Sequence, residues 1–357
     1  MNIIDYIEKN GKYTFLEKEL NEVDKLIFSN LSYVDFKDLL DNNFKNKKSI
    51  ESVGEEFFKR KYDKEKRILA IKGGIKALKA MYKTKRYKDL LIYNYEKVIN
   101  ANLQFSALTI EINKNLLYIS FEGTDESTIG WKEDFELSYK NIIESHKMAI
   151  RYLNRFTFKD CKLIVGGHSK GGNLALVSAM YTNFIVRNKI INIYSYDGPG
   201  LLRGSLHSKR YMKIKDKYIH IIPNNSVVGI MLYSTNNVVI KTKHIGILSH
   251  FILNWEVDLE NLVSDKMRQS TIDLQIRMNS WIEKYNDEQK KIFVEELFDI
   301  FEKNNIKSLI VILEKPSILI KLLKEKSKMN NEMFKDFEDM VKNFIFANVK
   351  ETITKKQ

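Results

Sequence analysis

The sequence has a single cysteine, Cys161, among 357 residues, which excludes an internal disulfide bond. It contains three prolines, and no apolar run approaches the roughly 20 residues that a membrane-spanning helix needs. The opening residues, MNIIDYIEKN, lack the charged and then apolar segments of a secretory signal. Hydrophobic residues make up 44% of the chain, enough for a large core. We therefore expect a globular protein that stays in a reducing cytoplasm.

The formal charge of +13 is unevenly distributed along the chain. Residues 45–88 include sixteen Lys or Arg against five Asp or Glu, an excess of eleven, whereas residues 261–357 include eighteen against sixteen. A basic segment of this kind can contact an anionic membrane surface, a nucleic acid or an acidic partner. Its simplest interpretation is a solvated helical face. Nucleic-acid binding is not expected, because no recognisable nucleic-acid module accompanies the charge.

Hydrophobic periodicity separates the chain into helical flanks and a β-rich middle. Apolar residues have helical spacing in residues 1–42, and the basic segment at about 43–90 is also mostly helical by this criterion. Beyond residue 260 the chain is polar and helical again. We expect residues 1–260 to form one domain and residues 261–357 to form a helical C-terminal region.

The middle of the chain predicts the fold class. Two helices, expected at about 138–155 and 172–187, alternate with short β-rich runs. These runs are FSALTIEI, LLYISFEG, KLIVGG, INIYSYDG, YIHIIP and NVVIKT. Such alternation is typical of an α/β protein with a mostly parallel sheet flanked by helices. We expect the first two runs to pair antiparallel at the start of this sheet.

The stretch LIVGGHSKGGNLALVSAM, residues 163–180, predicts a nucleophile elbow. An apolar strand leads into Gly-x-Ser-x-Gly and leaves as a helix, so Gly167 and Gly171 would flank an exposed Ser169 hydroxyl. The N–H of Lys170, at the start of the helix, could then bind an oxyanion. The alternatives are a glycine-rich turn with an incidental serine, or a phosphate-binding turn. The phosphate-binding pattern Gly-x-x-x-x-Gly-Lys-Ser/Thr is absent.

A nucleophilic serine requires a base and an acid that orients the base. In α/β-hydrolases the acid follows the serine and precedes the histidine, and only Asp197 and Asp216 lie between Ser169 and His250. Asp197 follows the run INIYSY, so it would lie at the same sheet edge as Ser169. Asp216 precedes a strand and would lie at the opposite edge. We therefore select Asp197, whose alternative role is that of a turn former in Asp-Gly-Pro-Gly.

Two histidines remain as candidates for the base. His168 lies inside the elbow and would point away from the serine, His207 lies in a basic loop close after the acid, and His220 lies within a strand. His244 and His250 follow the last apparent strand and could fold over the upper edge of the sheet. We favour His250 and retain His244 as the alternative, with a purely structural histidine possible at either position.

A second oxyanion donor is expected after an earlier strand. The run LLYISFEG ends in a loop in which Gly123 permits close approach and Thr124 offers a backbone N–H or a hydroxyl. Trp131 and Asp134 are expected to brace this loop. An ordinary capped surface turn is the alternative.

These motifs resemble the bacterial family called domain of unknown function 2974, a relative of the class 3 (fungal-type) lipases. The resemblance covers about residues 1–260 in collinear order. The matching blocks are the opening IIDYIEKNGKYTFLEKELNEVDKLIFSNLSY, QFSA, FEGTDESTIGWKEDFELSY, GGHSKGGNLAL, YSYDGPG, NNSVVGIML and SHFILNW. The resemblance implies that Ser169 is the nucleophile, that Thr124 lies in the oxyanion loop and that a histidine near residue 250 is the base.

One departure concerns the acid. Where class 3 lipases present their aspartate in an Asn-Asp-x-Val-like stretch, this chain reads Asn224-Asn225-Ser226-Val227 and has no carboxylate. The acid is therefore left to Asp197.

We predict a serine hydrolase that cleaves carboxylic esters, with lipid or lysolipid esters as the substrate class and no metal or organic cofactor. The alternative is an inactive hydrolase-fold protein that serves as a binding or scaffold protein, which the missing acid at 225–226 suggests. Peripheral contact with an anionic membrane surface is a further expectation.

Overall fold

The computed structural model describes residues 1–60, 69–125 and 127–306, together with short helical pieces between residues 317 and 342. Its described strands form an eight-stranded sheet that runs from β1 to β8 in chain order, and a separate two-stranded pair. The strands are β1 (Lys48–Ser49), β2 (Leu91–Ile99), β3 (Gln104–Asn113), β4 (Leu116–Phe121), β5 (Lys162–His168), β6 (Ile190–Tyr196), β7 (Tyr218–Pro223), β8 (Asn237–Ile240), β9 (Val257–Asp258) and β10 (Asn261–Leu262).

The sheet changes direction at β4. Strands β1 to β4 pair antiparallel, and β4 to β8 pair parallel. The predicted mostly parallel sheet is confirmed, as is its antiparallel entry, because the first two β-rich runs are β3 and β4. This is an α/β-hydrolase-like fold. Parallel strands place their carboxyl ends at one edge, so the residues after β4, β5, β6 and β7 lie close together.

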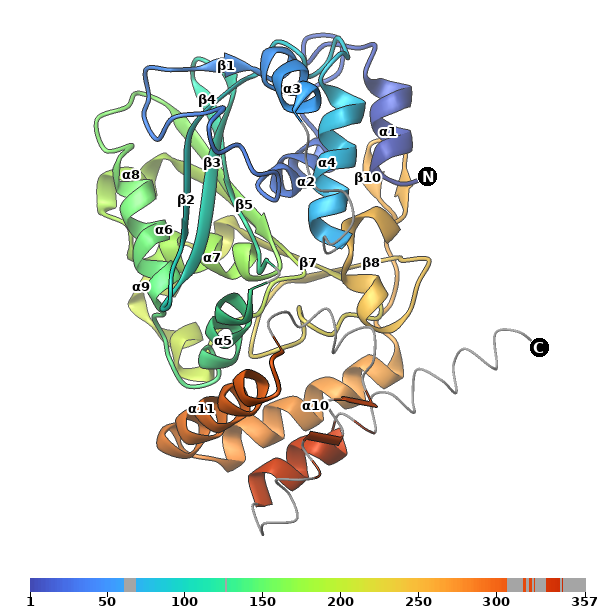
Figure 1. The fold of residues 1–357 in the computed structure, drawn as a ribbon. Helices are drawn as coiled ribbons and strands as arrows, with labels where there is room; N and C mark the ends of the chain where they lie inside the picture. The colour runs from blue at the N-terminus through green and yellow to red at the C-terminus, as the bar shows by residue number, and fades with distance from the viewer. Residues whose placement is uncertain are drawn as a thin grey trace, which may run out of the picture.

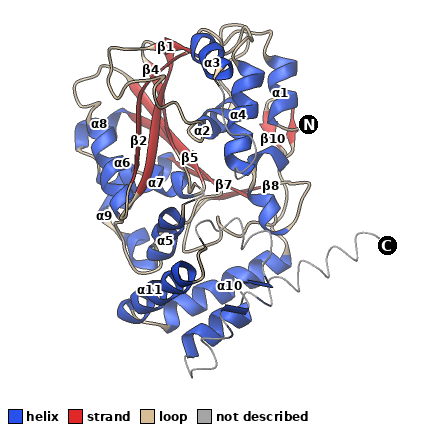
Figure 2. Cartoon of the chain, viewed as in Figure 1, coloured by secondary structure: helices blue, strands red, loops and turns tan. Residues whose placement is uncertain are grey.

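Helices cover both faces of the sheet, as Figures 1 and 2 show. They are α1 (Ile3–Asn10), α2 (Glu22–Leu31), α3 (Ile50–Lys59), α4 (Leu69–Met81), α5 (Thr128–Glu136), α6 (Glu144–Asn154), α7 (Lys170–Tyr181), α8 (Phe184–Lys189), α9 (Lys209–Met212), α10 (Gln269–Lys284) and α11 (Asp287–Lys303). Neighbouring strand residues point to opposite faces. Tyr118 packs with helices α1 to α4, whereas Leu117 and Ile119 pack with α6 and α7.

Strand β2 and two helix boundaries differ from the sequence interpretation, in which the run FSALTIEI is the first strand. The polar residues Asn94 and Glu96 obscure the strand pattern of β2, and a bulge at this point puts Asn94 at φ 53°. Arg151 of α6 and Arg155, the residue after this helix, form ion pairs with Glu96. The helix expected at 138–155 begins only at residue 144, and the helix expected at 172–187 is divided into α7 and α8, where Asn183 caps α8.

The C-terminal helices share a core with the sheet domain. Residues of α10, α11 and a helical piece at 332–340 pack with Leu137 and Ile143, which flank α5 and α6. Trp131, expected to brace the loop after β4, packs against this cluster. Part of the helical C-terminal region predicted at 261–357 lies outside the described residues. In the described part of the chain, no helix is both long and apolar enough to cross a membrane.

Candidate active site

Ser169 lies in a strained turn between β5 and α7. Its backbone has φ 57° and ψ −134°, a conformation that a non-glycine residue adopts only when its surroundings enforce it. The Ser169 N–H donates to the Tyr196 carbonyl at 2.9 Å. A Cβ at Gly171 would overlap the Phe121 carbonyl oxygen, so glycine is required there. The turn therefore has the geometry of a nucleophile elbow.

The structure brings the side chains of Asp197 and His250 into contact. The His250 Nδ1 and the Asp197 Oδ2 are 2.6 Å apart, although 53 residues separate them in sequence. Asp197 follows β6, has φ 51° and is fully buried. Its other oxygen accepts from the Ser226 hydroxyl at 2.5 Å and from the Gly229 N–H at 3.0 Å. These donors hold the carboxylate in one orientation toward the imidazole.

His250 lies directly beside the elbow. It ends a short 3₁₀ segment, Gly246–His250, and its ring centroid is 4.4 Å from that of His168, the residue before Ser169. His168 Nε2 is 2.8 Å from the His250 carbonyl oxygen, and its Nδ1 is 2.8 Å from the Tyr33 hydroxyl. Burial lowers the pKa of His168 well below its usual value, so this ring is neutral and links the N-terminal region to the His250 loop.

The other histidines lie elsewhere. His244 is exposed, and its backbone N–H donates to the Thr242 hydroxyl at 3.4 Å. His207 is exposed at the end of a 3₁₀ segment, Arg203–His207. His220 is buried in β7 and contacts the Gly198 carbonyl oxygen at 2.9 Å. Among the candidates for the base, the structure brings His250 to Asp197 and leaves His244 at the surface.

The loop after β4 lies against the elbow. A Cβ at Gly123 would overlap the Tyr33 hydroxyl and the His168 carbonyl oxygen, which shows how closely the two segments approach. The Thr124 hydroxyl donates to Asp134 Oδ2, so Asp134 braces this loop as expected. Because that hydroxyl is engaged, the backbone N–H of Thr124 is the group left to serve as an oxyanion donor.

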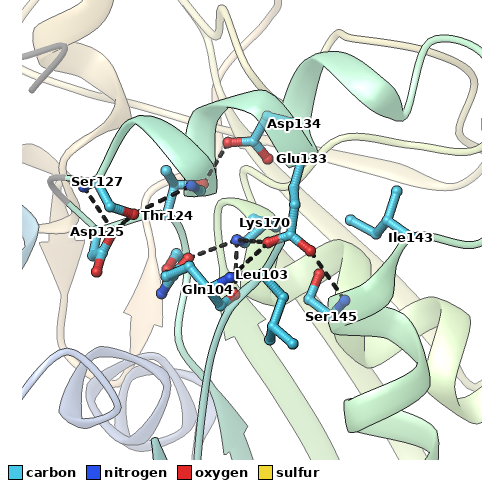
Figure 3. A network of polar contacts seen from close by, with 12 residues as sticks. Leu103, Gln104, Thr124, Asp125, Ser127, Glu133, Asp134, Ile143, Ser145 and Lys170 are labelled. Atoms are coloured by element: carbon cyan, nitrogen blue, oxygen red, sulfur yellow. Dashed lines mark hydrogen bonds and ion pairs between the residues drawn. The ribbon is translucent and has the colours of Figure 1, made fainter. Parts of the chain in front are cut away.

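The Lys170 side chain is buried in a polar network that the sequence did not predict (Figure 3). Its Nζ donates to Glu133 Oε2 at 3.0 Å, to Gln104 Oε1 at 2.6 Å and to the Gln104 carbonyl oxygen at 3.0 Å. The other Glu133 oxygen accepts from the Ser145 N–H at 3.0 Å, and the Gln104 side chain donates to the Gly123 carbonyl oxygen at 3.1 Å. The network therefore ties α7, α5 and the Gly123 loop together.

Replacing Lys170 with Met should destabilise the fold by about 3–5 kcal/mol, because it leaves the Glu133 carboxylate buried without its cation. The double variant Lys170→Met, Glu133→Gln should recover much of this loss, since no buried charge then remains. Urea unfolding followed by circular dichroism measures both changes. Equal stability of Lys170→Met and the wild type would contradict a structural role for the ion pair.

Two buried carboxyl groups near the elbow have raised pKa values. Burial raises the pKa of Glu122 to about 7, and the nearby Lys97 only partly opposes this shift. Burial also raises the pKa of Asp134 to about 6, against the effect of Lys170. The folded protein therefore holds protons on these groups at a pH where the unfolded chain has lost them.

This arrangement predicts a pH-dependent stability that depends on Glu122. A raised carboxyl pKa favours the folded state at low pH, and the advantage is lost as pH rises from about 4.5 to about 7. Glu122→Gln should match the wild type at pH 4.5 and be more stable at pH 8, by at most about 3 kcal/mol, since one pKa unit corresponds to about 1.4 kcal/mol. Urea unfolding at both pH values measures the difference. A stability difference that does not change with pH would contradict the assignment.

No grouping of three or more His, Cys, Asp or Glu side chains in the described residues could hold a metal ion. The sequence interpretation missed Tyr33, Gln104 and Glu133, which support the site from other elements. The sequence does contain one signal that could have identified Glu133. A lysine at the first position of a buried helix requires an acidic partner, and the segment WKEDFE at 131–136 supplies it.

Three comparisons relate the chain to known proteins. A family model described as Mbeg1-like matches residues 81–299, which are 219 of the 357 residues. Among solved structures, one described as the crystal structure of M37 lipase is 16% identical, with a TM-score of 0.33, and the match covers 58% of this chain and 68% of that chain. No curated protein matches the sequence.

Proposed function

The chain belongs to the Mbeg1-like family, and from the arrangement of Ser169, His250 and Asp197 we propose that it is a serine hydrolase that cleaves carboxylic esters. The observation that carries this proposal is the 2.6 Å contact between His250 and a fully buried Asp197, next to a strained serine. A buried carboxylate bonded to Nδ1 fixes the imidazole tautomer and leaves Nε2 as the basic nitrogen.

The proposed reaction follows from these roles. Ser169 Oγ attacks the ester carbonyl carbon while His250 Nε2 takes the hydroxyl proton. The carbonyl oxygen becomes an oxyanion that the N–H groups of Lys170 and Thr124 bind. His250 then gives its proton to the departing alcohol as the ester C–O bond breaks, and a water molecule activated by His250 hydrolyses the acyl-enzyme. Each proton taken from an oxygen returns to an oxygen, so the cycle needs no cofactor.

Lipid or lysolipid esters are the proposed substrate class, by resemblance to the class 3 lipases and to the family called domain of unknown function 2974. The supporting residues are the Glu-Gly-Thr loop at 122–124 and the GHSKGG block at 167–172. We also propose a cytoplasmic location, which a single cysteine in the whole sequence supports.

A fluorophosphonate probe tests the proposal. An activated serine forms a covalent adduct with the probe, and peptide mapping should place the adduct on Ser169. An inactive binding or scaffold protein with the same fold would remain unlabelled. Ser178, which lies on α7 two turns further along, serves as the internal control and should carry no adduct. Absence of labelling at Ser169 in folded protein would refute the hydrolase and favour the scaffold alternative.

A further inference from the structure

Three segments far apart in sequence meet at the amino ends of β5, β6 and β7, the edge opposite Ser169. They are residues 157–162, 183–191 and 208–218, here called the amino-edge patch. Lys189 Nζ donates to the Thr157 carbonyl oxygen at 2.8 Å, and Lys217 Nζ donates to the Ile190 carbonyl oxygen at 2.7 Å. These bonds hold the three segments side by side. The helices within them, α8 and α9, lie on the same side of the molecule in Figure 1.

The amino-edge patch is strongly basic. Its 26 residues include nine Lys or Arg against two Asp, an excess of seven, whereas the whole chain has a net charge of +13. The nine are Lys159, Lys162, Arg187, Lys189, Lys209, Arg210, Lys213, Lys215 and Lys217. Within the described residues, no carboxylate lies at ion-pair distance from any of them. The charge of the patch is therefore not neutralised by that part of the protein.

The basic segment at 45–88 differs in this respect. Five of its basic side chains pair with carboxylates: Lys47 with Glu111, Lys48 and Arg60 with Glu56, Lys85 with Glu17 and Arg86 with Asp24. Residues 61–68 of the segment lie outside the described residues. Within the described residues, five of the twelve basic side chains of this segment thus have acidic partners, against none of the nine in the amino-edge patch.

Large apolar side chains project from the same patch. Phe158 is 97% exposed, Phe184 is 68% exposed and Met212 is 50% exposed. A surface hollow of about 630 Å³ lies beside Phe184 at the amino end of β5, lined in part by Phe184, Ile185 and Lys162. Exposed aromatic and aliphatic groups among lysines are typical of surfaces that enter the interface of a bilayer.

We propose that the amino-edge patch docks the protein onto an anionic lipid bilayer. The uncompensated lysines would meet the negative surface potential, and Phe158, Phe184 and Met212 would enter the headgroup region. A nucleic acid would use the charge but not the aliphatic Met212 and Ile185. This docking involves no residue of the proposed active site and would leave Ser169 at the edge that faces away from the membrane.

Sedimentation with lipid vesicles tests the proposal on the full-length protein. The protein should bind vesicles of phosphatidylglycerol, bind phosphatidylcholine vesicles weakly, and lose affinity as salt rises, because mobile ions screen exposed charges. The variant Lys162→Gln, Lys209→Gln, Lys213→Gln should bind about a hundredfold more weakly, since each lysine near an anionic surface contributes about fivefold. Equal binding to both kinds of vesicle, or binding to neither, would overturn the proposal.

A matched variant distinguishes an effect of the amino-edge patch on vesicle binding from an effect of the protein's net charge. Lys72, Lys76 and Lys79 are exposed on α4, and replacing all three with Gln removes the same charge from the 45–88 segment. This control should change binding by less than about fivefold. An equal loss in both triple variants would overturn the proposal, as would a DNA duplex that binds more tightly than the vesicles and competes with them.

The apolar contribution has its own control. Phe158→Ser with Phe184→Ser should weaken vesicle binding at least tenfold, whereas Leu16→Ser, which removes a 99% exposed side chain elsewhere, should not. Cys161, the only cysteine, lines the same hollow, so its reaction with a thiol reagent should slow when vesicles are bound. An unchanged thiol reaction rate on saturating vesicles would overturn the proposed orientation. Ser169→Ala should bind vesicles as the wild type does. The docking proposal and the hydrolase proposal can therefore be refuted independently of each other.

Discussion

Ser169→Ala should lower the rate of hydrolysis of a short p-nitrophenyl ester by about three to six orders of magnitude, because the members of a catalytic triad act as a unit and the remaining groups cannot replace the nucleophile. Thermal stability should stay nearly unchanged, since serine and alanine are equally strained at φ 57°. Initial rates and a thermal melt, measured on the same preparation, check both expectations.

Two further variants make this result specific. Ser169→Gly should be equally inactive but more stable by about 1–3 kcal/mol, because glycine adopts the positive φ without strain. Ser178→Ala alters another buried serine, on α7, and should keep activity close to that of the wild type. Near-normal hydrolysis by Ser169→Ala would remove Ser169 as the nucleophile.

The elbow was predictable because all of its determinants are local. The strand, the turn with Gly167, Ser169 and Gly171, and the helix lie within 18 consecutive residues, so their order fixes the geometry. Asp197 could be selected by a rule about sheet edges that needs only the direction of the strands. Its contact with His250 agrees with that selection, since the structure brings this pair together.

The support around the site was not predictable in the same way. Lys170 contacts Gln104 across 66 residues and Glu133 across 37 residues, and the sequence pattern of each residue alone fits an ordinary surface position. The amino-edge patch is hidden for a related reason. Its basic residues come from three short segments, none of which has a long run of like charge, and only the fold brings them together.

Ser226 accounts for the departure from the class 3 pattern at residues 224–227. This position has no carboxylate, yet its hydroxyl donates to Asp197 at 2.5 Å. In the proposed mechanism the acid therefore comes from the end of β6, and Ser226, near the end of β7, is its hydrogen-bond donor. The missing aspartate, which suggested an inactive scaffold, is compatible with an intact acid supplied by the neighbouring strand.

Asp197→Asn tests this relocation of the acid directly. The variant should keep the fold, because asparagine tolerates the positive φ at this turn, but should lose about a thousandfold or more of kcat. An amide cannot stabilise the imidazolium that forms when His250 takes the proton from Ser169. Asp216→Asn provides the control, since Asp216 lies in the exposed 3₁₀ segment Lys215–Lys217 at the opposite edge of the sheet, and should leave kcat within about twofold of the wild type.

Two carboxylates that follow His250 closely in sequence, Glu256 and Asp258, are the alternative sources of the acid. Glu256 forms an ion pair with Lys241 at 3.2 Å, and Asp258 is exposed in β9. Neither is bonded to His250 among the contacts of the described residues, whereas Asp197 is. If Asp197→Asn retains full kcat while Ser169→Ala loses it, His250 works without a buried acid and the Asp-Gly-Pro-Gly turn is structural. If both variants retain the wild-type rate, the hydrolysis does not arise at this site, and the binding or scaffold alternative is favoured.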